Sequence, residues 1–543
     1  MAFASTRGFR LRAVAVVVVA VALTMTGCSA GSRGSASGGG ALTIGTTDKI
    51  TSLDPAGSYD SGSFAVMSQV FPFLMSTPYG GADVVPDSAE SAEFTAPTKY
   101  TVKLKPGLKW ANGHDLTSSD VKFSFDRQLA IAAPSGPSSL LANLLDVAAL
   151  DDTTVVFTLK SENDQTFPHV LSSPAGPIVD EQVFSADRIS PDTDIVAANA
   201  FGGQYTIANY TVNNLIQYRA YADYRGVLGA AKTGIVNVKY YADSSNLKLD
   251  IQGGNIDVAY HSLSATDVED LRGNDKVKVV DGPGGEIRFI VFNFDTQPFG
   301  TKTQEPNNAK ALAVRQAVAD LLDRDEIARQ VYKGTYTPLY SSVSAGLTGA
   351  NSPMKSLYGN GQGGPDAARA RARLSAVGVN TPITLNLQYS NDHYGPSSGD
   401  EYAQIKDQLE SSGLFTVNLQ TTEWVQYTKD RSSDVYPAYQ LGWFPDYSDP
   451  DNYLSPFYIK GNFLANHYDD AEVQSLIAQQ VGTSDSGART ALIQEIQEKV
   501  AAQLPTVPYL QGSRVAVVGR TVTGTENTLD ASFTFHYAAL SKG

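Results

Sequence analysis

Apolar and polar positions follow two alternating periods along this chain. Short segments with a period of two are typical of half-buried strands, and the stretches between them carry a period near 3.6, which indicates amphipathic helices. The interleaving of the two periods predicts an α/β architecture. The predicted strands are Ala41–Gly45, Tyr100–Leu104, Thr153–Leu159, Leu215–Arg219, Val236–Tyr241, Asn255–Ala259, Ile287–Phe294, Ile383–Tyr389 and Phe415–Gln420.

Helix starts are marked by capping residues. Thr117 is followed three residues later by Asp120, which resembles a capping box, and it precedes an apolar face of Val121, Phe125 and Leu129. Asp323 begins another helix in the same way, with Glu326 three residues on. The other predicted helices are Ser63–Val70, Leu247–Gly253, the apolar face from Val314 to Leu322, Glu401–Leu409, Ala471–Gln480 and Ala488–Gln503.

The order strand, helix, strand between residues 383 and 420 predicts a βαβ unit and therefore a mixed sheet. The chain has 543 residues, which is too many for one hydrophobic core and predicts two or three lobes. No internal repeat is visible in the sequence.

The pattern of the amino terminus predicts an export signal. Arg7, Arg10 and Arg12 precede the apolar run Ala13–Leu23, which is too short to span a membrane but suits the core of a signal peptide. The run ends near Cys28, the only cysteine of the chain, in the order Met25-Thr26-Gly27-Cys28. Two interpretations remain open: a lipoprotein signal with Cys28 as the lipid acceptor, which we favour, and an ordinary secretory signal with an incidental cysteine.

The segment after Cys28 is made of Gly, Ser and Ala apart from one arginine, so residues 29–40 are predicted to be a flexible linker. The whole chain has a net charge of −15, and removal of residues 1–27 takes away three arginines, which gives −18. A chain this acidic, without a long basic run, is not expected to bind nucleic acid. With one cysteine, the folded part must depend on hydrophobic cores rather than disulfides.

Motifs for catalysis or metal binding are missing from the sequence. The histidines His114, His169, His261, His393, His467 and His536 are isolated from one another, and there is no HExxH, CxxC or GxSxG. We therefore expect no catalytic residues, no metal site and no cofactor, although a spatially assembled triad remains an alternative. The run Gly282-Pro283-Gly284-Gly285 lacks the context of a phosphate loop and is predicted to be a turn.

Several segments carry a family resemblance when they are taken together and in order. The clearest is YTVKLKPGLKWANGHDLTSSDVKFSFDR, in which Asp115 stands where Pro is usual and Ser118 where Ala is usual. The other segments are Gly202–Gly226, Gln252–Ala259, Val291–Gln330 and Gly442–Asn452. The set resembles family 5 of the extracytoplasmic solute-binding proteins of ABC transporters, the group of oligopeptide- and dipeptide-binding lipoproteins.

The resemblance implies a large, bilobed periplasmic-binding-protein-like α/β fold of the class II type, with an extra α/β domain beside the first lobe. By position, we expect lobe I to comprise residues 41–74, 196–286 and 510–543, the extra domain residues 75–195, and lobe II residues 287–509. The signal would occupy residues 1–28 and end at the lipid-acceptor cysteine.

The resemblance also implies where a ligand binds. Asp446 in the sequence GWFPDYSDPDN matches the position that pairs with the amino terminus of a peptide, and Gly442 and Phe444 match positions whose backbone pairs with ligand. Trp443 and Tyr447 are further candidates, each with core packing as an equal alternative. Turn formation is the expected role of Asp449, Pro450 and Asn452. Ile50–Leu53, which follows the first strand, is expected to line the cleft and to contact the ligand through its backbone. Trp424 and Tyr427 are expected in the core, with a place in the pockets for ligand side chains as the alternative.

The function that follows is that of a receptor. It would capture di- or oligopeptides in a cleft between lobes and deliver them to a membrane permease that is driven by ATPase subunits. We expect a monomer on the extracytoplasmic face of the cell membrane, held by the lipid anchor. The alternatives are the same role for a sugar, an opine, an antimicrobial compound or a nickel complex, or a secreted hydrolase, or an adhesive lipoprotein.

Overall fold

The computed structural model describes residues 40–543 except residues 82, 396 and 530–533. Cys28, the signal and the linker up to residue 39 lie outside the described residues, so their predicted roles stay predictions. Among the described residues, no helix is both long enough and apolar enough to cross a membrane.

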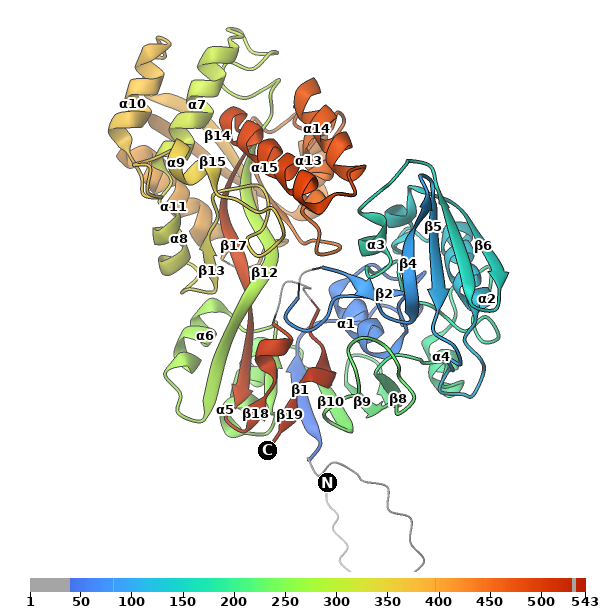
Figure 1. The fold of residues 1–543 in the computed structure, drawn as a ribbon. Helices are drawn as coiled ribbons and strands as arrows, with labels where there is room; N and C mark the ends of the chain where they lie inside the picture. The colour runs from blue at the N-terminus through green and yellow to red at the C-terminus, as the bar shows by residue number, and fades with distance from the viewer. Residues whose placement is uncertain (1–39, 82, 396, 530–533) are drawn as a thin grey trace, which may run out of the picture. The chain divides into compact units, whose positions relative to one another are not determined.

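A mixed sheet of eleven strands forms the backbone of the fold (Figure 1). Two long antiparallel strands, β12 (Val277–Phe292) and β17 (Thr506–Gly519), pair along nearly their whole length and lie at the centre of the sheet. The strands on one side of this pair, in order, are β11 (Val258–Tyr260), β1 (Leu42–Thr46), β10 (Ile235–Tyr240), β9 (Leu215–Ala220) and β8 (Tyr205–Thr211). On the other side are β16 (Ala438–Trp443), β14 (Ile383–Ser390) and β15 (Phe415–Thr422), and β13 (Tyr336–Pro338) pairs with β17.

The remaining strands form smaller sheets. A four-stranded antiparallel sheet has the order β4 (Ala89–Ala96), β5 (Lys99–Leu104), β7 (Thr154–Leu159), β6 (Leu144–Asp151). Two-stranded pairs are formed by β2 (Met75–Ser76) with β3 (Val85–Pro86), and by β18 (Val522–Thr523) with β19 (Ser541–Lys542).

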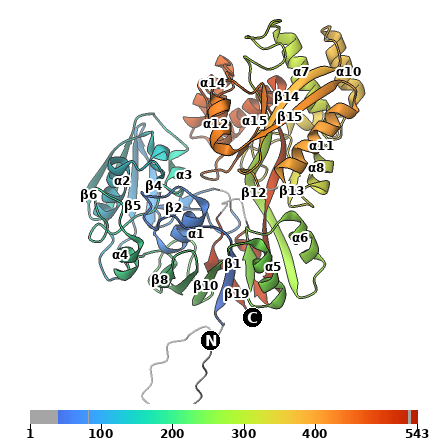
Figure 2. The ribbon, with the colours of Figure 1, turned by 180° about the vertical axis from the view of Figure 1, so that it is seen from behind.

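The helices surround these sheets, and Figure 2 shows α11 and α12 beside β14 and β15. The α-helices before β12 are α1 (Ser61–Val70), α2 (Ser118–Ile131), α3 (Phe167–Val170), α4 (Asp192–Ala197), α5 (Ser244–Gly253) and α6 (Ala265–Arg272). Those after it are α7 (Asn308–Leu321), α8 (Arg324–Gln330), α9 (Pro353–Leu357), α10 (Ala367–Ala376), α11 (Ser398–Ser411), α12 (Trp424–Ser432), α13 (Ser455–Tyr458), α14 (Ala471–Val481) and α15 (Ser486–Gln503). The 3-10 turns are η1 (Ser138–Leu141), η2 (Pro450–Tyr453), η3 (Thr525–Asn527) and η4 (Tyr537–Ala539).

Buried apolar side chains divide into clusters that follow the chain. One cluster combines residues from 42–71, 179–260 and 516–540. A second lies between residues 74 and 178, around the four-stranded sheet. Two further clusters are built from residues 287–510, on the two faces of β12, β16 and their neighbours. Each cluster excludes water from its own group of elements, so the fold is stabilised by several cores rather than one.

Local signals in the sequence explain most element boundaries. The capping box of Thr117 and Asp120 is confirmed. The side chain of Asp120 accepts a hydrogen bond from the backbone N–H of Thr117, and the side chain of Thr117 accepts one from the backbone N–H of Ser119. Asp323 caps α8 by accepting from the N–H of Glu326 at 2.8 Å. The βαβ unit is confirmed, because β14 and β15 are parallel and α11 connects them. Leu129 differs from its prediction: it is 39% exposed, in the last turn of α2.

The prediction of a turn at Gly282–Gly285 was wrong, because these residues lie inside β12. A side chain at Gly284 would collide with the C=O of Gly512 on β17, so glycine permits a close approach of the two strands there. The pairing register shifts between Pro283 and Ile287, where proline has no N–H to donate. The predicted strand Asn255–Ala259 begins later, at Val258.

Candidate ligand-binding site

The sequence GWFPDYSDPDN starts on the last two residues of β16 and continues into a loop. β12 pairs with β16 as far as Trp443, whereas β14 pairs with β16 only at Ala438 and Tyr439. On the side away from β12, Gly442–Trp443 therefore has no partner strand among the described residues, although the hydroxyl of Tyr394 lies 3.5 Å from the C=O of Gly442. An unpaired edge of this kind offers main-chain groups to an extended ligand.

Gly442 is required by packing at this position. A Cβ atom there would lie 2.9 Å from the C=O of Ile287 and 3.0 Å from the ring of Tyr394. Both contacts are tighter than normal van der Waals distances, so a larger residue would displace β16 from β12 or move the tyrosine. The glycine thus keeps the end of the strand flat against its neighbours, independently of any ligand.

Asp446 follows three residues after the strand, and its carboxylate has two different partners. The Nδ2 group of Asn452 donates to Oδ2 at 3.1 Å, and the hydroxyl of Tyr59 donates to Oδ1. Tyr59 belongs to the segment between β1 and α1, far away in sequence, and is 40% exposed. The candidate site therefore combines the loop after β16 with the segment after β1.

The carboxylate of Asp446 has no cation within ion-pair distance among the described residues. Burial raises the pKa of Asp446 to about 6, and the hydrogen bond from Asn452 opposes part of that rise. A desolvated carboxylate without a counterion favours a cationic partner, because attraction to a positive charge compensates for the hydration that burial removed. The site is therefore chemically suited to an ammonium group.

The loop is held in place by a short helical turn and an ion pair. Asp449 caps η2 and its carboxylate accepts two hydrogen bonds from Arg489, both at 2.8 Å. His169, from the segment that packs on the four-stranded sheet, lies 3.3 Å from the same carboxylate. Asp449 is buried, and the charges of His169 and Arg489 lower its pKa. These contacts fix the turn that presents Asp446.

The other predicted residues have distinct positions. Phe444 is 50% exposed. Trp443 is half-buried and packs edge-on against Phe457 and Phe463, with ring centroids 5.1 and 5.5 Å apart. Tyr447 packs against the core of residues 74–178, with its ring 6.1 Å from that of His169. Asp446, Trp443 and Tyr447 are thus brought together, while Phe444 faces solvent.

In the segment after β1, two backbone N–H groups already have partners within the protein. The N–H groups of Ile50 and Leu53 already donate to the side chains of Asn213 and Asp192, at 2.7 and 2.8 Å. They are thus not free for a ligand, and Tyr59 is the residue of this segment that reaches Asp446. A buried ion pair between Asp54 and Arg127, with bonds of 2.7 and 2.9 Å, holds the same segment in place.

Sequence reasoning missed Tyr59 and undervalued Asn452. Asn452 was expected to form a turn, yet its side chain contacts both Asp446 and Trp443. The only sign of this role in the sequence was that Asn452 lies in Gly442–Asn452, one of the segments that resemble the family. Tyr59 carried no signal, because its contact depends on the tertiary structure. Tyr427 is fully buried, which confirms its expected place in the core, and Trp424 is only partly buried, stacked on His393.

One group of side chains has the composition of a metal site. Asp295, Asp434 and His467 offer ligand atoms within 4.8 Å of one another. The ammonium of Lys302 already lies 2.8 Å from Asp295 and 3.3 Å from Asp434, so this cluster has its own cation. It also lies on residues other than those around Asp446, and we assign it no role in binding.

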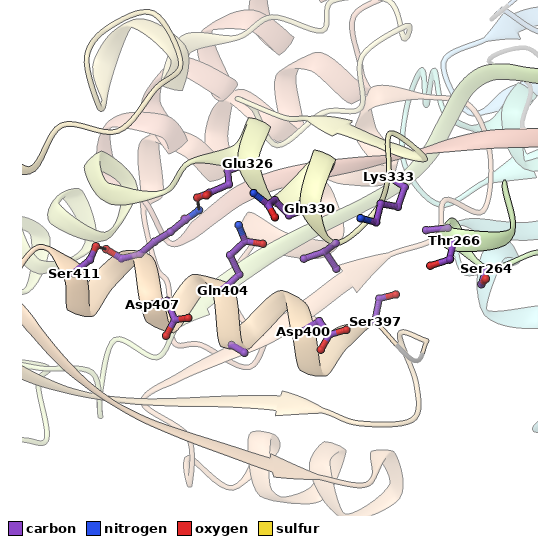
Figure 3. A pocket seen from close by; sticks show the side chains of 14 residues that line it. Ser264, Thr266, Glu326, Gln330, Lys333, Ser397, Asp400, Gln404, Asp407 and Ser411 are labelled. Carbon is purple, nitrogen blue, oxygen red and sulfur yellow. Dashed lines mark hydrogen bonds between the residues drawn. The ribbon is translucent and has the colours of Figure 1, made fainter. Parts of the chain in front are cut away.

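A cavity of about 650 Å³ lies elsewhere in the fold, between α8, α11 and the start of α6 (Figure 3). Polar side chains dominate its lining, including Thr266, Glu326, Lys333, Asp400 and Asp407. None of the ligand-binding residues that the sequence predicts lines it. The candidate site is therefore defined by the chemistry around Asp446 rather than by this cavity.

Comparison with known proteins identifies the class. The chain is 22% identical to the ABC transporter substrate-binding protein CtaP of Listeria monocytogenes, with a TM-score of 0.76 over 93% of this chain and 99% of that one. It is 20% identical to DppA of Helicobacter pylori in complex with the peptide STSA, with a TM-score of 0.69 over 93% and 98%. The fold is thus the bilobed α/β fold of periplasmic substrate-binding proteins, as the sequence predicted.

The family follows from the sequence itself. Residues 83–464 match the model of the bacterial extracellular solute-binding proteins, family 5. The dipeptide-binding protein DppE of Bacillus subtilis is 23% identical over 515 residues, which are 90% of each chain. This chain belongs to family 5 of the bacterial extracellular solute-binding proteins, whose members found here are transport proteins rather than enzymes.

Proposed function

We propose that this protein captures peptides with a free amino terminus and that Asp446 binds their ammonium group. The observation that carries the proposal is the carboxylate of Asp446, which is desolvated and has no cationic partner among the described residues. An α-ammonium is the cation that every unmodified peptide supplies. The hydrogen bonds of Asn452 and Tyr59 leave the carboxylate with further acceptor capacity, since a carboxylate has about four acceptor sites.

Support for a peptide comes from the neighbouring strand edge. An extended peptide can pair its main chain with Gly442–Trp443, while its amino terminus lies at Asp446. Phe444 and Trp443 would then flank the first residues of the ligand. The peptide-binding relatives DppE and H. pylori DppA support the same class of ligand.

Delivery to a membrane permease with ATPase subunits completes the proposed role. We propose that Cys28 carries the lipid anchor and that residues 29–40 act as the linker to it, so that the receptor stays beside the permease as a monomer. We further propose lobe I as residues 41–74, 196–286 and 510–543, the extra domain as 75–195, and lobe II as 287–509, with ligand held between the lobes. Buried side chains of residues 42–71 and 179–195 share one core, which supports contact between the proposed lobe I and the end of the proposed extra domain.

The test is calorimetric titration of the mature protein with di- to pentapeptides and with the same peptides acetylated at the amino terminus. We expect binding of the free peptides and a large loss on acetylation, because the amide is uncharged. No binding across a diverse set of peptides would overturn the proposed ligand class. Equal binding of free and acetylated peptides would remove Asp446 from the mechanism.

A further inference from the structure

Asn452 lies at the centre of the loop that carries Asp446. It is 2% exposed and sits in η2, the short turn that Asp449 caps. Its Oδ1 atom accepts from the Nε1–H of Trp443 at 2.8 Å and from the backbone N–H of Asp446 at 3.0 Å. Its Nδ2 group donates to Oδ2 of Asp446 at 3.1 Å. One amide thus contacts three groups of the candidate site.

The orientation of this amide is determined by its partners. The indole N–H of Trp443 and the backbone N–H of Asp446 can only donate, so the oxygen of Asn452 must face them. The NH₂ group must then face the carboxylate of Asp446, which as an ionised group can only accept. Reversing the amide would place two donors against NH₂ and oxygen against carboxylate, so the reversed orientation is unfavourable at every contact.

We propose that Asn452 is the positioning residue of the ammonium site: it orients the carboxylate of Asp446, keeps it ionised, and couples it to the indole of Trp443. The inference rests on the proposed function of Asp446. Asn452 itself needs no contact with the ligand, since its polar atoms are directed at the loop. Its effect on binding is indirect, through the charge and direction of the carboxylate.

Because the carboxylate of Asp446 is desolvated, the hydrogen bond from Asn452 has a large effect on its ionisation. Burial is the main influence on the pKa of Asp446, and the hydrogen bond from Asn452 opposes it, alongside the one that Tyr59 donates to the other carboxylate oxygen. Tyr447 and Tyr453 lie close to Asp446, but burial raises the pKa of both phenols, so they stay neutral near pH 7. Without Asn452, the carboxylate would hold its proton to a higher pH, and a protonated carboxyl no longer attracts an ammonium.

The variants N452D and N452A test this role. N452D has the same shape but places a second carboxylate against Asp446, and N452A removes the donor. For both, we expect the pH at which affinity for a free-amine peptide falls by half to move upward, by about one pH unit. At a fixed pH of 6.5, a midpoint that moves from about 6 to about 7 lowers the ionised fraction, and with it the affinity, by roughly threefold. Asn418, whose amide contacts Asn386 on the sheet edge, provides the matched control N418A with no expected change.

The outcomes separate this inference from the proposed function. Equal weakening of free and acetylated peptides in N452A and N452D, with an unchanged pH midpoint, would show that Asn452 only supports the loop and would overturn the inference. The variant D446N tests the proposed function on its own. It also reports any titration that comes from Asp451, whose pKa burial raises to about 7.

A measurement on the unmutated protein does not depend on how the variants fold. The chain has three tryptophans, so the indole N–H signals in a nitrogen-15 spectrum can be assigned with W443F. We expect the Trp443 signal to titrate near pH 6 in the unmutated protein and to lose that titration in D446N. A Trp443 signal that is constant between pH 5 and 8 would contradict the coupling through Asn452.

Discussion

Replacing Asp446 by Asn is the perturbation whose size follows most directly from the structure. The substitution keeps the shape of the side chain and the acceptor for Tyr59, but removes the charge. Burial, opposed in part by the hydrogen bond from Asn452, moves the pKa of Asp446 from 3.8 to about 6. Each pKa unit corresponds to about 1.4 kcal/mol, so the surroundings cost the charged form a net of about 3 kcal/mol. A ligand ammonium that pairs with the carboxylate can recover an energy of this order.

We therefore expect D446N to weaken a free-amine peptide by about 3 kcal/mol, which is roughly 150-fold in Kd. The same peptide with an acetylated amino terminus should change by less than about threefold, since it has no charge to lose. The assay is isothermal titration calorimetry at pH 8, where Asp446 is ionised. Asp187, which is exposed, provides the control variant D187N.

A D446N protein that binds both peptides as the unmutated protein does would refute the reasoning, because the charge would then contribute nothing. A loss of equal size for both peptides would also refute it. That result would mean that Asp446 shapes the loop rather than pairing with the ammonium.

Three further predictions concern stability and location. Burial raises the pKa of Glu401 to about 7, so its neutral form contributes full stability below pH 4.5, and this contribution is lost as the pH rises through 7. In denaturant unfolding, E401Q should reduce this loss of stability with rising pH. An unchanged pH dependence in E401Q would contradict the assignment. R489M should leave the buried Asp449 without its main partner and lower the free energy of unfolding by about 3 kcal/mol. The control K499M, at a more exposed ion pair, should lower it by less than about 1 kcal/mol. Similar losses in the two variants would contradict the structural role of the buried Asp449–Arg489 pair. C28S should move the protein from the membrane fraction to the medium, and continued membrane attachment would exclude the lipid anchor.

Much of the fold could be predicted from the chain, because local physics determines it. The capping residues Thr117 and Asp323 begin helices in the sequence and in the structure alike, and the alternation at Ile383–Tyr389 forms a strand as expected. Strands with weak or mixed patterns were missed, among them β4, whose side chains are mostly exposed, and β16, which is buried throughout its first five residues. Neither pattern has a clear period of two, so periodicity could not reveal them.

The site could be predicted only in part. Asp446 was found because the segment around it resembles a known family, but its uncompensated charge depends on burial that no sequence pattern reports. Tyr59 reaches Asp446 from nearly 400 residues away in sequence. Asn452 was recognised only as a turn residue, since Asn has a high propensity for turns whether or not its side chain has a further role. Contacts between distant segments are therefore the part that required the structure.

A crystal structure of the mature protein with a bound peptide tests the central claim most directly. The account predicts that the peptide's amino nitrogen lies about 3 Å from a carboxylate oxygen of Asp446, with the first residues of its main chain paired along Gly442–Trp443. A peptide bound with its amino terminus elsewhere, and Asp446 still joined only to Tyr59 and Asn452, would contradict the account.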